Sequence, residues 1–570
     1  MEYMRLGELL IDAGAITQEQ LDRGIELQKA NRGERLGTTL IKNGIITEAN
    51  LIEALQMQLG IEFIDLTKVT IPTDMAQALP RNLAKQHNVV PVRMEKDTLY
   101  LAMSAPLNFF ATGEIKKVVR KRIVPMVATA SGVEHAIQVL YSNEGAAKAI
   151  EDMKREAAIN GDETPVQNAA FATTRVDDVG ASNAPTIRLV NSMMERSVTE
   201  RASDIHMEPR EDHMRVRMRI DGVMRSILTI PQAVQSSVIS RIKVMANLDI
   251  AERRVPQDGR FNIQIKDKSI DVRVSTLPTV YGEKVVMRLL DKSGGRVTKD
   301  AVGLTGSDLE KYDEMLSLRS GVLLLVGPTG SGKTTTMYAM INQLNTDEVN
   351  LVTLEDPVEY NVDGVNQVQI NEKTGMTFAG GLRSILRQDP DIIAVGEIRD
   401  GETAGIAMRA AITGHIVLST IHTNDAVGTI DRLRDIGVEP YVIASALRGV
   451  ISQRLVRRVC PYCRESYTPS DKELRTLGLE PEERFPFYRG VGCQQRYNTG
   501  YLGRAAVFEM LTIDDEISAL IYEQAGRKAI DEVLKRPEKG FVSMRQNALR
   551  LMREGITTSA EVLRVISKNN

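Results

Sequence analysis

One junction in the sequence limits the possible folds more than any other. The run VLLLV at residues 322–326 is wholly apolar and passes directly into GPTGSGKT at residues 327–334, after which residues 335–340 have the composition of a helix. Such an apolar run is typical of a strand that is buried on both faces of a parallel sheet. Strand, glycine-rich loop and helix, in this order, are the context in which G-x-x-x-x-G-K-[ST] is a phosphate-binding P-loop.

This loop predicts a site for a nucleoside triphosphate. The backbone N–H groups of a glycine-rich loop surround phosphate oxygens, and the helix N-terminus adds a favourable dipole. Lys333 is expected to reach the β- and γ-phosphates, and Thr334 is expected to ligate Mg²⁺. The expected nucleotide-binding residues are Gly327, Pro328, Thr329, Gly330, Ser331, Gly332, Lys333, Thr334 and Thr335.

Three further apolar runs end in polar side chains. The first, at residues 351–354, is followed by EDPVE, whose carboxylates fall where a base that activates water is needed. In the second, at residues 391–397, the usual terminal Asp is replaced by Gly-Glu, so Glu397 is expected to face Mg²⁺ directly or through water. The third is followed by His422, which can sense a γ-phosphate. Open α/β sheets bind ligands at the carboxyl ends of their strands, so we expect these groups to surround one nucleotide.

An arginine-bearing strand precedes the P-loop by about a hundred residues. Residues 215–220 read RVRMRI, an alternation that places three arginines on one face and apolar side chains on the other, and Asp221-Gly222 supplies a hairpin turn. Two interpretations stay open: a solvated strand face, or cations that reach phosphate, a role suited to the permanent charge and two-pronged head of arginine. Later basic residues, Arg273 among them, are not distinguishable from ordinary hairpin positions.

The composition argues against several classes of protein. The 570 residues suffice for three or four domains. Lys and Arg number 72 against 75 Asp and Glu, a net charge of −3, and aromatic residues are 4% with no Trp, so no nucleic-acid partner is expected. No apolar run approaches the roughly 20 residues that cross a bilayer, and the first residues lack the apolar stretch of a signal peptide.

The N-terminal part is a repeat. Residues 5–28 and 35–58 share Arg-Leu-Gly, a Leu-Ile pair, a Gly, Ile-Thr, a Leu and a closing Gln. Thr17 and Gln20 predict a capping box for the second helix of the first copy. The patterning is compatible with a duplicated helical adaptor with a leucine core. It is also compatible with a pseudo-symmetric site for a two-fold symmetric dinucleotide, because Arg and Gln can bind phosphates and base edges.

We expect four parts. Residues 1–142 form an N-terminal regulatory domain, in which residues 1–60 carry the repeat and the remainder is a small α/β unit. Residues 143–183 are polar and small, which predicts a flexible linker. Residues 184–298 form the middle domain that supplies arginines. Residues 299–570 form the P-loop domain, with a Cys-bearing insert at about 456–505.

Three segments carry a resemblance to a known family. LEDPVEY, LRQDPDIIAVGEIRD and TGHIVLSTIHTNDA resemble the type II secretion and type IV pilus assembly ATPases, and ASDIHMEPR and RMRIDGVMR extend the likeness over the middle domain. The resemblance implies an α/β multidomain protein with a RecA-like C-terminal domain, an α+β middle domain and a helical-repeat plus α/β N-terminal domain. It further implies ATP hydrolysis coupled to mechanical work, in pilus extension or in protein export.

The same resemblance implies residue roles and partners. Glu359 would be the general base, Glu397 the Walker B carboxylate that faces Mg²⁺, and His422 part of the His box. Arg217, Arg219 and Arg225 would be brought against ATP by the middle domain. The protein would be a cytoplasmic homohexamer at the inner face of the membrane, associated peripherally through an inner-membrane platform protein.

The repeat resembles the tandem cyclic di-GMP-binding motif of some of these ATPases, with Ile25 replacing Leu. The matching residues are Arg5, Leu6, Gly7, Leu21, Ile25, Gln28, Arg35, Leu36, Gly37, Leu51, Leu55 and Gln58. Cyclic di-GMP is therefore the expected regulator.

The three cysteines suit a reducing compartment rather than a disulfide framework. Cys460 and Cys463 form a zinc half-site, and Cys493 can supply a third thiolate, but Arg496 stands where the family pattern has a fourth ligand. Two possibilities stay open: a weaker zinc site completed by water or a carboxylate, and a metal-free subdomain.

Two other functions compete with the motor. One is a nucleic-acid translocase with a similar P-loop core, against which the charge and the scarce aromatic residues argue. The other is a cyclic di-GMP-gated scaffold that does not hydrolyse ATP, against which the intact Lys333, Glu359 and Glu397 argue.

Overall fold

The computed structural model describes most of the chain beyond residue 75 and parts of the chain before it. The described residues are 7, 10–11, 16–30, 39–40, 43, 46, 61–66, 69, 71–72, 75–104, 108–130, 132–134, 136–137, 140–141, 149–155, 184–265, 268–291, 297–493 and 499–566.

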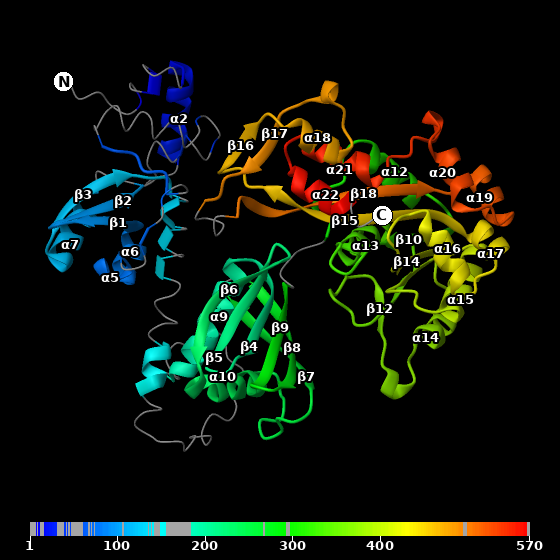
Figure 1. Cartoon of the computed structure of the whole chain (residues 1–570), viewed down its shortest axis with the longest axis horizontal. Helices are drawn as coiled ribbons and strands as arrows, with labels where there is room; N and C mark the ends of the chain where they lie inside the picture. The colour runs from blue at the N-terminus through cyan, green and yellow to red at the C-terminus, as the bar shows by residue number, and fades with distance from the viewer. Residues whose placement is uncertain are drawn as a thin grey trace.

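A seven-stranded sheet forms the centre of the C-terminal domain (Figure 1). Its strands are β10 (Gly321–Val326), β11 (Leu351–Glu355), β12 (Asn366–Gln369), β13 (Ile392–Val395), β14 (Ile416–Ile421), β15 (Leu447–Val459) and β18 (Tyr501–Thr512). They lie in the order β12-β11-β13-β14-β10-β15-β18, and only the β15–β18 pair is antiparallel. The four strands predicted from apolar runs are confirmed, and their carboxyl ends share one edge of the sheet.

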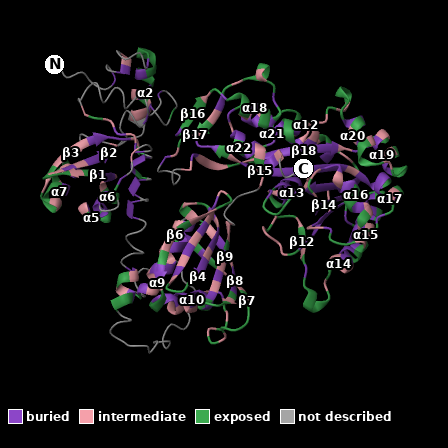
Figure 2. Ribbon diagram, in the orientation of Figure 1, coloured by how far each residue is buried: buried purple, intermediate pink, exposed green. Residues whose placement is uncertain are grey.

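Helices cover both faces of this sheet. They are α11 (Lys299–Val302), α12 (Ser307–Leu316), α13 (Lys333–Leu344), α14 (Phe378–Ile385), α15 (Gly401–Ile412), α16 (Gly428–Asp435), α17 (Pro440–Ala446), α19 (Asp515–Tyr522) and α20 (Arg527–Leu534). Every residue of β10 is buried, and the central strand β13 is likewise buried along its whole length, as Figure 2 shows for the interior of this domain. Leu324 packs into the core that includes α15 and α17, whereas Leu325 packs into the core that includes α12 and α13. The strand before the P-loop is therefore held from both sides.

A Cys-bearing subdomain extends from strands β15 and β18. It contains β16 (Arg464–Tyr467), α18 (Asp471–Leu477), β17 (Phe487–Gly490), α21 (Met544–Arg553) and α22 (Ser559–Ile566), with β16 and β17 paired antiparallel. Short 3₁₀ helices are η1 (Glu372–Thr374), η2 (Pro481–Glu483) and η4 (Pro537–Lys539).

The middle domain is an antiparallel sheet packed on two helices. Its elements are α9 (Pro185–Thr199), β4 (Ala202–Pro209), β5 (His213–Ile220), β6 (Val223–Pro231), α10 (Gln232–Met245), β7 (Gln257–Ile265), β8 (Lys268–Thr279) and β9 (Gly282–Asp291). The strand order is β6-β5-β4-β9-β8-β7. On β5, Val216 and Met218 are fully buried while Arg217 and Arg219 are only half-buried, so the predicted alternation is confirmed. Asp221 and Gly222 have φ of 48° and 83°, as a hairpin turn requires.

The predicted linker differs from the structure at residues 149–155, which are helical. Ala149 and Met153 are buried in the core of the middle domain, and Arg188 of α9 donates a hydrogen bond to Asp152 at 2.7 Å. The small and polar composition that indicated a linker conceals two apolar residues four positions apart, which one face of a helix can bury.

Among the described residues, the N-terminal part has a small hydrophobic core that includes Leu21 and a larger one that includes Leu99. Its elements are α2 (Gln18–Ala30), α5 (Met75–Ala78), α6 (Arg81–His87), β1 (Val89–Glu95), β2 (Thr98–Met103), α7 (Phe109–Val119) and β3 (Arg122–Val127), with the strands in the order β1-β2-β3. The predicted capping box before α2 is confirmed: Gln20 N–H donates to Thr17 Oγ1 at 3.3 Å, and Thr17 N–H donates to Gln20 Oε1 at 2.9 Å.

Candidate nucleotide site

The P-loop is packed tightly against strand β15. Gly327 has φ of +142°, and a Cβ at this position would lie 2.4 Å from the carbonyl oxygen of Gln453. Gly332 has φ of +93°, and its Cβ would lie 2.7 Å from the Gln453 side-chain amide. Gln453 also accepts a hydrogen bond from Thr336 Oγ1 at 2.7 Å. Glycine is therefore required at both positions, because any side chain would push the loop away from β15.

Lys333 lies at the first turn of α13, with its ammonium group folded against the loop. Lys333 Nζ donates to the carbonyl oxygens of Gly327 at 2.7 Å and Pro328 at 3.2 Å. Burial lowers the pKa of Lys333, and the nearby Glu397 carboxylate partly offsets this effect. The charge is thus held beside the loop and within reach of a carboxylate.

The loop has unused polar groups that suit a phosphate. The Ser331 side chain is 3% exposed, and its hydroxyl has no hydrogen-bond partner in the described part of the chain. Thr334 and Thr335 are exposed at the N-terminus of α13. An orphaned buried hydroxyl beside a helix N-terminus and a lysine fits a nucleotide phosphate, and the free Thr334 hydroxyl fits a hard cation such as Mg²⁺.

Glu355 and Glu359, which the sequence analysis treated as one group of carboxylates, lie in different surroundings in the structure. Glu355 is 3% exposed, and its carboxylate accepts hydrogen bonds from Tyr338 Oη at 2.5 Å and Thr353 Oγ1 at 2.6 Å. Glu359 is only partly buried, and its Oε2 accepts a hydrogen bond from Arg273 Nη2 at 2.9 Å. Of these two, Glu359 is therefore the carboxylate that solvent and substrate can reach.

Glu397 lies at the end of β13 among basic side chains. It is paired with Arg399, and His422 Nε2 lies 3.5 Å from Glu397 Oε2. A Cβ at Gly396 would lie 3.3 Å from the Leu354 carbonyl oxygen, so a glycine allows the end of β13 to approach β11 closely. Lys333, Glu397 and His422 thus lie close together at one edge of the sheet, as the sequence predicts.

The middle-domain arginines lie in ion pairs. Arg215 and Arg217 donate to Glu208 at 3.0 and 2.5 Å, and Arg219 Nε lies 3.3 Å from Asp204. Burial alone would raise the pKa of Glu208, but the hydrogen bonds from Arg217 and Arg215 outweigh it and lower that pKa. The arginine face is therefore neither a bare solvated face nor a free set of cations.

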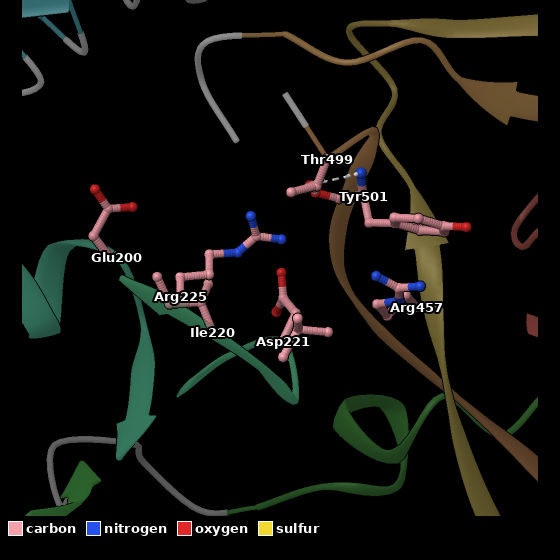
Figure 3. A pocket seen from close by; sticks show the side chains of 8 residues that line it. Glu200, Ile220, Asp221, Arg225, Arg457, Thr499 and Tyr501 are labelled. Carbon is pink, nitrogen blue, oxygen red and sulfur yellow. Dashed lines mark hydrogen bonds between the residues drawn. The ribbon is translucent and has the colours of Figure 1, made fainter. Parts of the chain in front are cut away.

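Arg225 lies elsewhere, at the junction with the Cys-bearing subdomain (Figure 3). There Asp221 accepts a hydrogen bond from Gly503 N–H at 3.2 Å, and the Arg457 guanidinium stacks on the Tyr501 ring at 3.9 Å. The cavity between these groups is about 10 Å³, which is too small for a nucleotide. The middle-domain arginine that contacts Glu359, the predicted base, is Arg273, which sequence reasoning did not separate from other hairpin residues.

The three cysteines come together. Cys460, Cys463 and Cys493 are buried, their sulfur atoms all lie within 4.8 Å of one another, and the Cys460 and Cys493 sulfurs are 3.8 Å apart. Burial and the neighbouring thiols raise the pKa of Cys493 to about 12. Two thiolates on a tetrahedral zinc ion with Zn–S bonds of about 2.3 Å are separated by about 3.8 Å, so the spacing fits zinc. Arg496 lies outside the described residues.

Four residues of the tandem motif are described. A Cβ on Gly7 would lie 2.7 Å from Leu21, so this glycine allows close packing onto α2. Leu21 is buried, whereas Ile25 and Gln28 on the same helix are half-buried. The other motif residues lie outside the described part: Arg5, Leu6, Arg35, Leu36, Gly37, Leu51, Leu55 and Gln58.

The chain is similar in sequence to known secretion and pilus proteins. A sequence model of the family described as "Type II/IV secretion system protein" matches residues 180–564, and a model of the MshEN domain matches residues 59–147. The type IV pilus assembly ATPase PilB of Myxococcus xanthus is 41% identical over 565 residues, 98% of each chain. The type II secretion system ATPase E of Vibrio cholerae is 42% identical over 82% of this chain and 92% of that protein.

Structural comparison supports the fold. The Legionella pneumophila ATPase DotB superposes with a TM-score of 0.50 and 20% identity, over 66% of this chain and 95% of that chain. None of the helices in the described residues has the length and apolar character needed to cross a bilayer.

Proposed function

Because this chain belongs to the family of type II/IV secretion system ATPases, we propose that it converts ATP hydrolysis at the P-loop into movement that drives pilus assembly or type II protein secretion. The observation that carries the proposal is the gathering of Lys333, Glu397 and His422 at the carboxyl edge of one parallel sheet. Pilus extension and protein export both fit, since relatives of both kinds match most of the chain.

Each group has a distinct task in this proposal. Lys333 holds the β- and γ-phosphates, and the remainder of the P-loop surrounds them with N–H donors. Thr334 and Glu397 hold Mg²⁺, which neutralises charge on the phosphates when it is bound. Glu359 accepts a proton from the attacking water, and His422 contacts the γ-phosphate side of the site. Catalysis of this kind consists of positioning and charge stabilisation.

The middle domain supplies cations when it closes on the nucleotide. Arg217, Arg219 and Arg225 carry this role, and their present carboxylate partners are Glu208 for Arg217 and Asp204 for Arg219. On closure, phosphate oxygens replace these carboxylates as partners of Arg217 and Arg219, while Arg215 stays paired with Glu208 and Arg288 with Asp204.

The N-terminal repeat is the regulatory site, and cyclic di-GMP is its ligand. Support comes from the motif residues on α2, and the MshEN match over residues 59–147 covers the segment that directly follows the repeat. Calorimetric titration of the full chain with cyclic di-GMP tests this assignment, with Gln28→Ala as the variant and Gln18→Ala, also on α2, as the control. Absence of heat with the parent chain at protein concentrations well above micromolar contradicts it.

The cysteine cluster holds zinc through three thiolates. The 3.8 Å separation of the Cys460 and Cys493 sulfurs supports this assignment. Elemental analysis of purified chain after a chelator wash measures it, and sub-stoichiometric zinc contradicts it.

The working form is a homohexamer at the cytoplasmic face of the inner membrane, bound there through a platform protein. The test of the whole proposal is ATP turnover of the full chain, with and without that platform protein. Lys333→Ala removes turnover, whereas Lys299→Ala, which removes an ion pair with Asp313, keeps it. The proposal is contradicted if the Lys333→Ala variant hydrolyses ATP as fast as the parent chain.

A further inference from the structure

Tyr338 connects the P-loop helix to the segment that carries Glu359. Its hydroxyl donates a hydrogen bond to Glu355 Oε2 at 2.5 Å. The Tyr338 hydroxyl oxygen itself accepts hydrogen bonds from the backbone N–H groups of Glu359 and Tyr360, each at 3.2 Å. A phenol hydroxyl can donate one hydrogen bond and accept two, so all hydrogen-bonding positions of the Tyr338 hydroxyl are occupied.

Glu355 fixes the direction of this hydroxyl. The other carboxylate oxygen of Glu355 accepts hydrogen bonds from Thr353 Oγ1 at 2.6 Å and Gln367 Nε2 at 3.1 Å, and the residue is 3% exposed. A buried carboxylate can only accept, so the Tyr338 proton must point toward it. The lone pairs of the phenol oxygen are then directed at the two amides of the Glu359 segment.

The segment is also held beyond Glu359. Gln367 of β12 donates to the Tyr360 carbonyl oxygen at 2.9 Å and accepts from Val362 N–H at 2.8 Å. The Tyr338 and Tyr360 rings pack edge to face with centroids 5.2 Å apart. The backbone of residues 359–362 is thus tied to a buried network, while the Glu359 side chain stays accessible.

We propose that Tyr338 is a positioning residue, which acts through Glu355 and the backbone amides to hold Glu359 at a set place relative to the phosphates. Tyr338 and Lys333 lie on the same helix, α13, so the helix that receives the phosphates also sets the place of the base. This inference rests on the proposed role of Glu359. It adds a physical link between nucleotide binding and the base, because movement of α13 moves both.

Removal of a single oxygen tests the proposal. Tyr338→Phe is expected to lower kcat about ten- to a hundred-fold while KM for ATP changes less than about two-fold, because the P-loop is untouched and the base is misplaced. Tyr312→Phe is the matched control: Tyr312 is fully buried in the same domain, and its hydroxyl has no partner among the described residues. Unchanged kcat in Tyr338→Phe overturns the proposal, as does an equal loss in both variants.

A second measurement is independent of catalysis. Hydrogen exchange of the peptide spanning residues 356–362 is expected to accelerate at least ten-fold in Tyr338→Phe and to stay unchanged in Tyr312→Phe. Unaltered hydrogen exchange in Tyr338→Phe contradicts the proposal that Tyr338 holds this segment in place. Glu355→Gln keeps the phenol but removes the charge that orients it, so an intermediate acceleration is expected, and equal exchange with the parent contradicts the role of Glu355. Glu359→Gln distinguishes failure of the base assignment from failure of the Tyr338 proposal. Full turnover in Glu359→Gln refutes the role of Glu359 as the base, whereas hydrogen exchange of residues 356–362 still tests whether Tyr338 holds this segment.

Discussion

Arg273 of β8 donates a hydrogen bond from Nη2 to Glu359 Oε2 across 2.9 Å, which joins the middle domain to the proposed base of the ATPase domain. The hydrogen bond occupies one of the two carboxylate oxygens of Glu359 and holds its side chain in place. The described arrangement is therefore one in which the base is restrained. We expect Glu359 to be released from Arg273 before ATP is hydrolysed.

Arg273→Ala is accordingly expected to raise basal ATP turnover by up to about five-fold. A partly exposed ion pair contributes up to about 1 kcal/mol, which sets this limit. Steady-state turnover of the full chain without partners is the measurement. Arg260→Ala, which changes the residue that faces Arg273 from strand β7, is the control. Turnover that falls in Arg273→Ala indicates instead that this arginine assists hydrolysis.

The core of the ATPase domain was predictable, because strands buried on both faces leave a continuous apolar run. The partners of the arginines were not: Arg217 pairs with Glu208 on the adjacent strand β4, a contact that depends on strand register. Tyr338 was likewise inconspicuous, since the sequence shows only a helix residue after the P-loop. Its role follows from a hydroxyl that meets two backbone amides, and backbone partners leave no pattern in a sequence.

Gly327→Ala is expected to abolish tight nucleotide binding and to lower the free energy of unfolding by about 1–3 kcal/mol. The added methyl group would lie 2.4 Å from the backbone oxygen of Gln453, and alanine is strained at φ of +142°. Fluorescent-nucleotide titration and thermal unfolding measure the two effects. Gly405→Ala on α15 has open space around the new methyl group and is the control, with stability equal to or above that of the parent. Nucleotide binding that survives in Gly327→Ala contradicts the tight packing of the loop on β15.

The Arg457–Glu561 pair gives a prediction for acid stability. Glu561 is 2% exposed and accepts hydrogen bonds from Arg457 N–H at 2.8 Å and from the Arg457 and Arg564 side chains at 2.9 Å. Burial alone would raise its pKa, but the Arg457 backbone and the two arginines outweigh it, so the pKa lies below the ordinary value of 4.5. A pKa that is depressed on folding stabilises the protein above pH 4.5, and this contribution is lost as the pH falls through the lower folded value.

Glu561→Gln is therefore expected to lower the free energy of unfolding by about 1–3 kcal/mol at pH 7, because it removes the charge that the arginines bind. The difference between parent and variant should shrink progressively below pH 4.5, since the parent loses the same contribution by protonation. Thermal unfolding of both chains between pH 7 and pH 3 measures this convergence. Glu554→Gln, at an exposed carboxylate that caps the C-terminal end of α21, is the control and should follow the parent at every pH. A parent–variant difference that stays constant as the pH falls would mean that the folded pKa of Glu561 is not depressed, and that the stabilisation comes from packing.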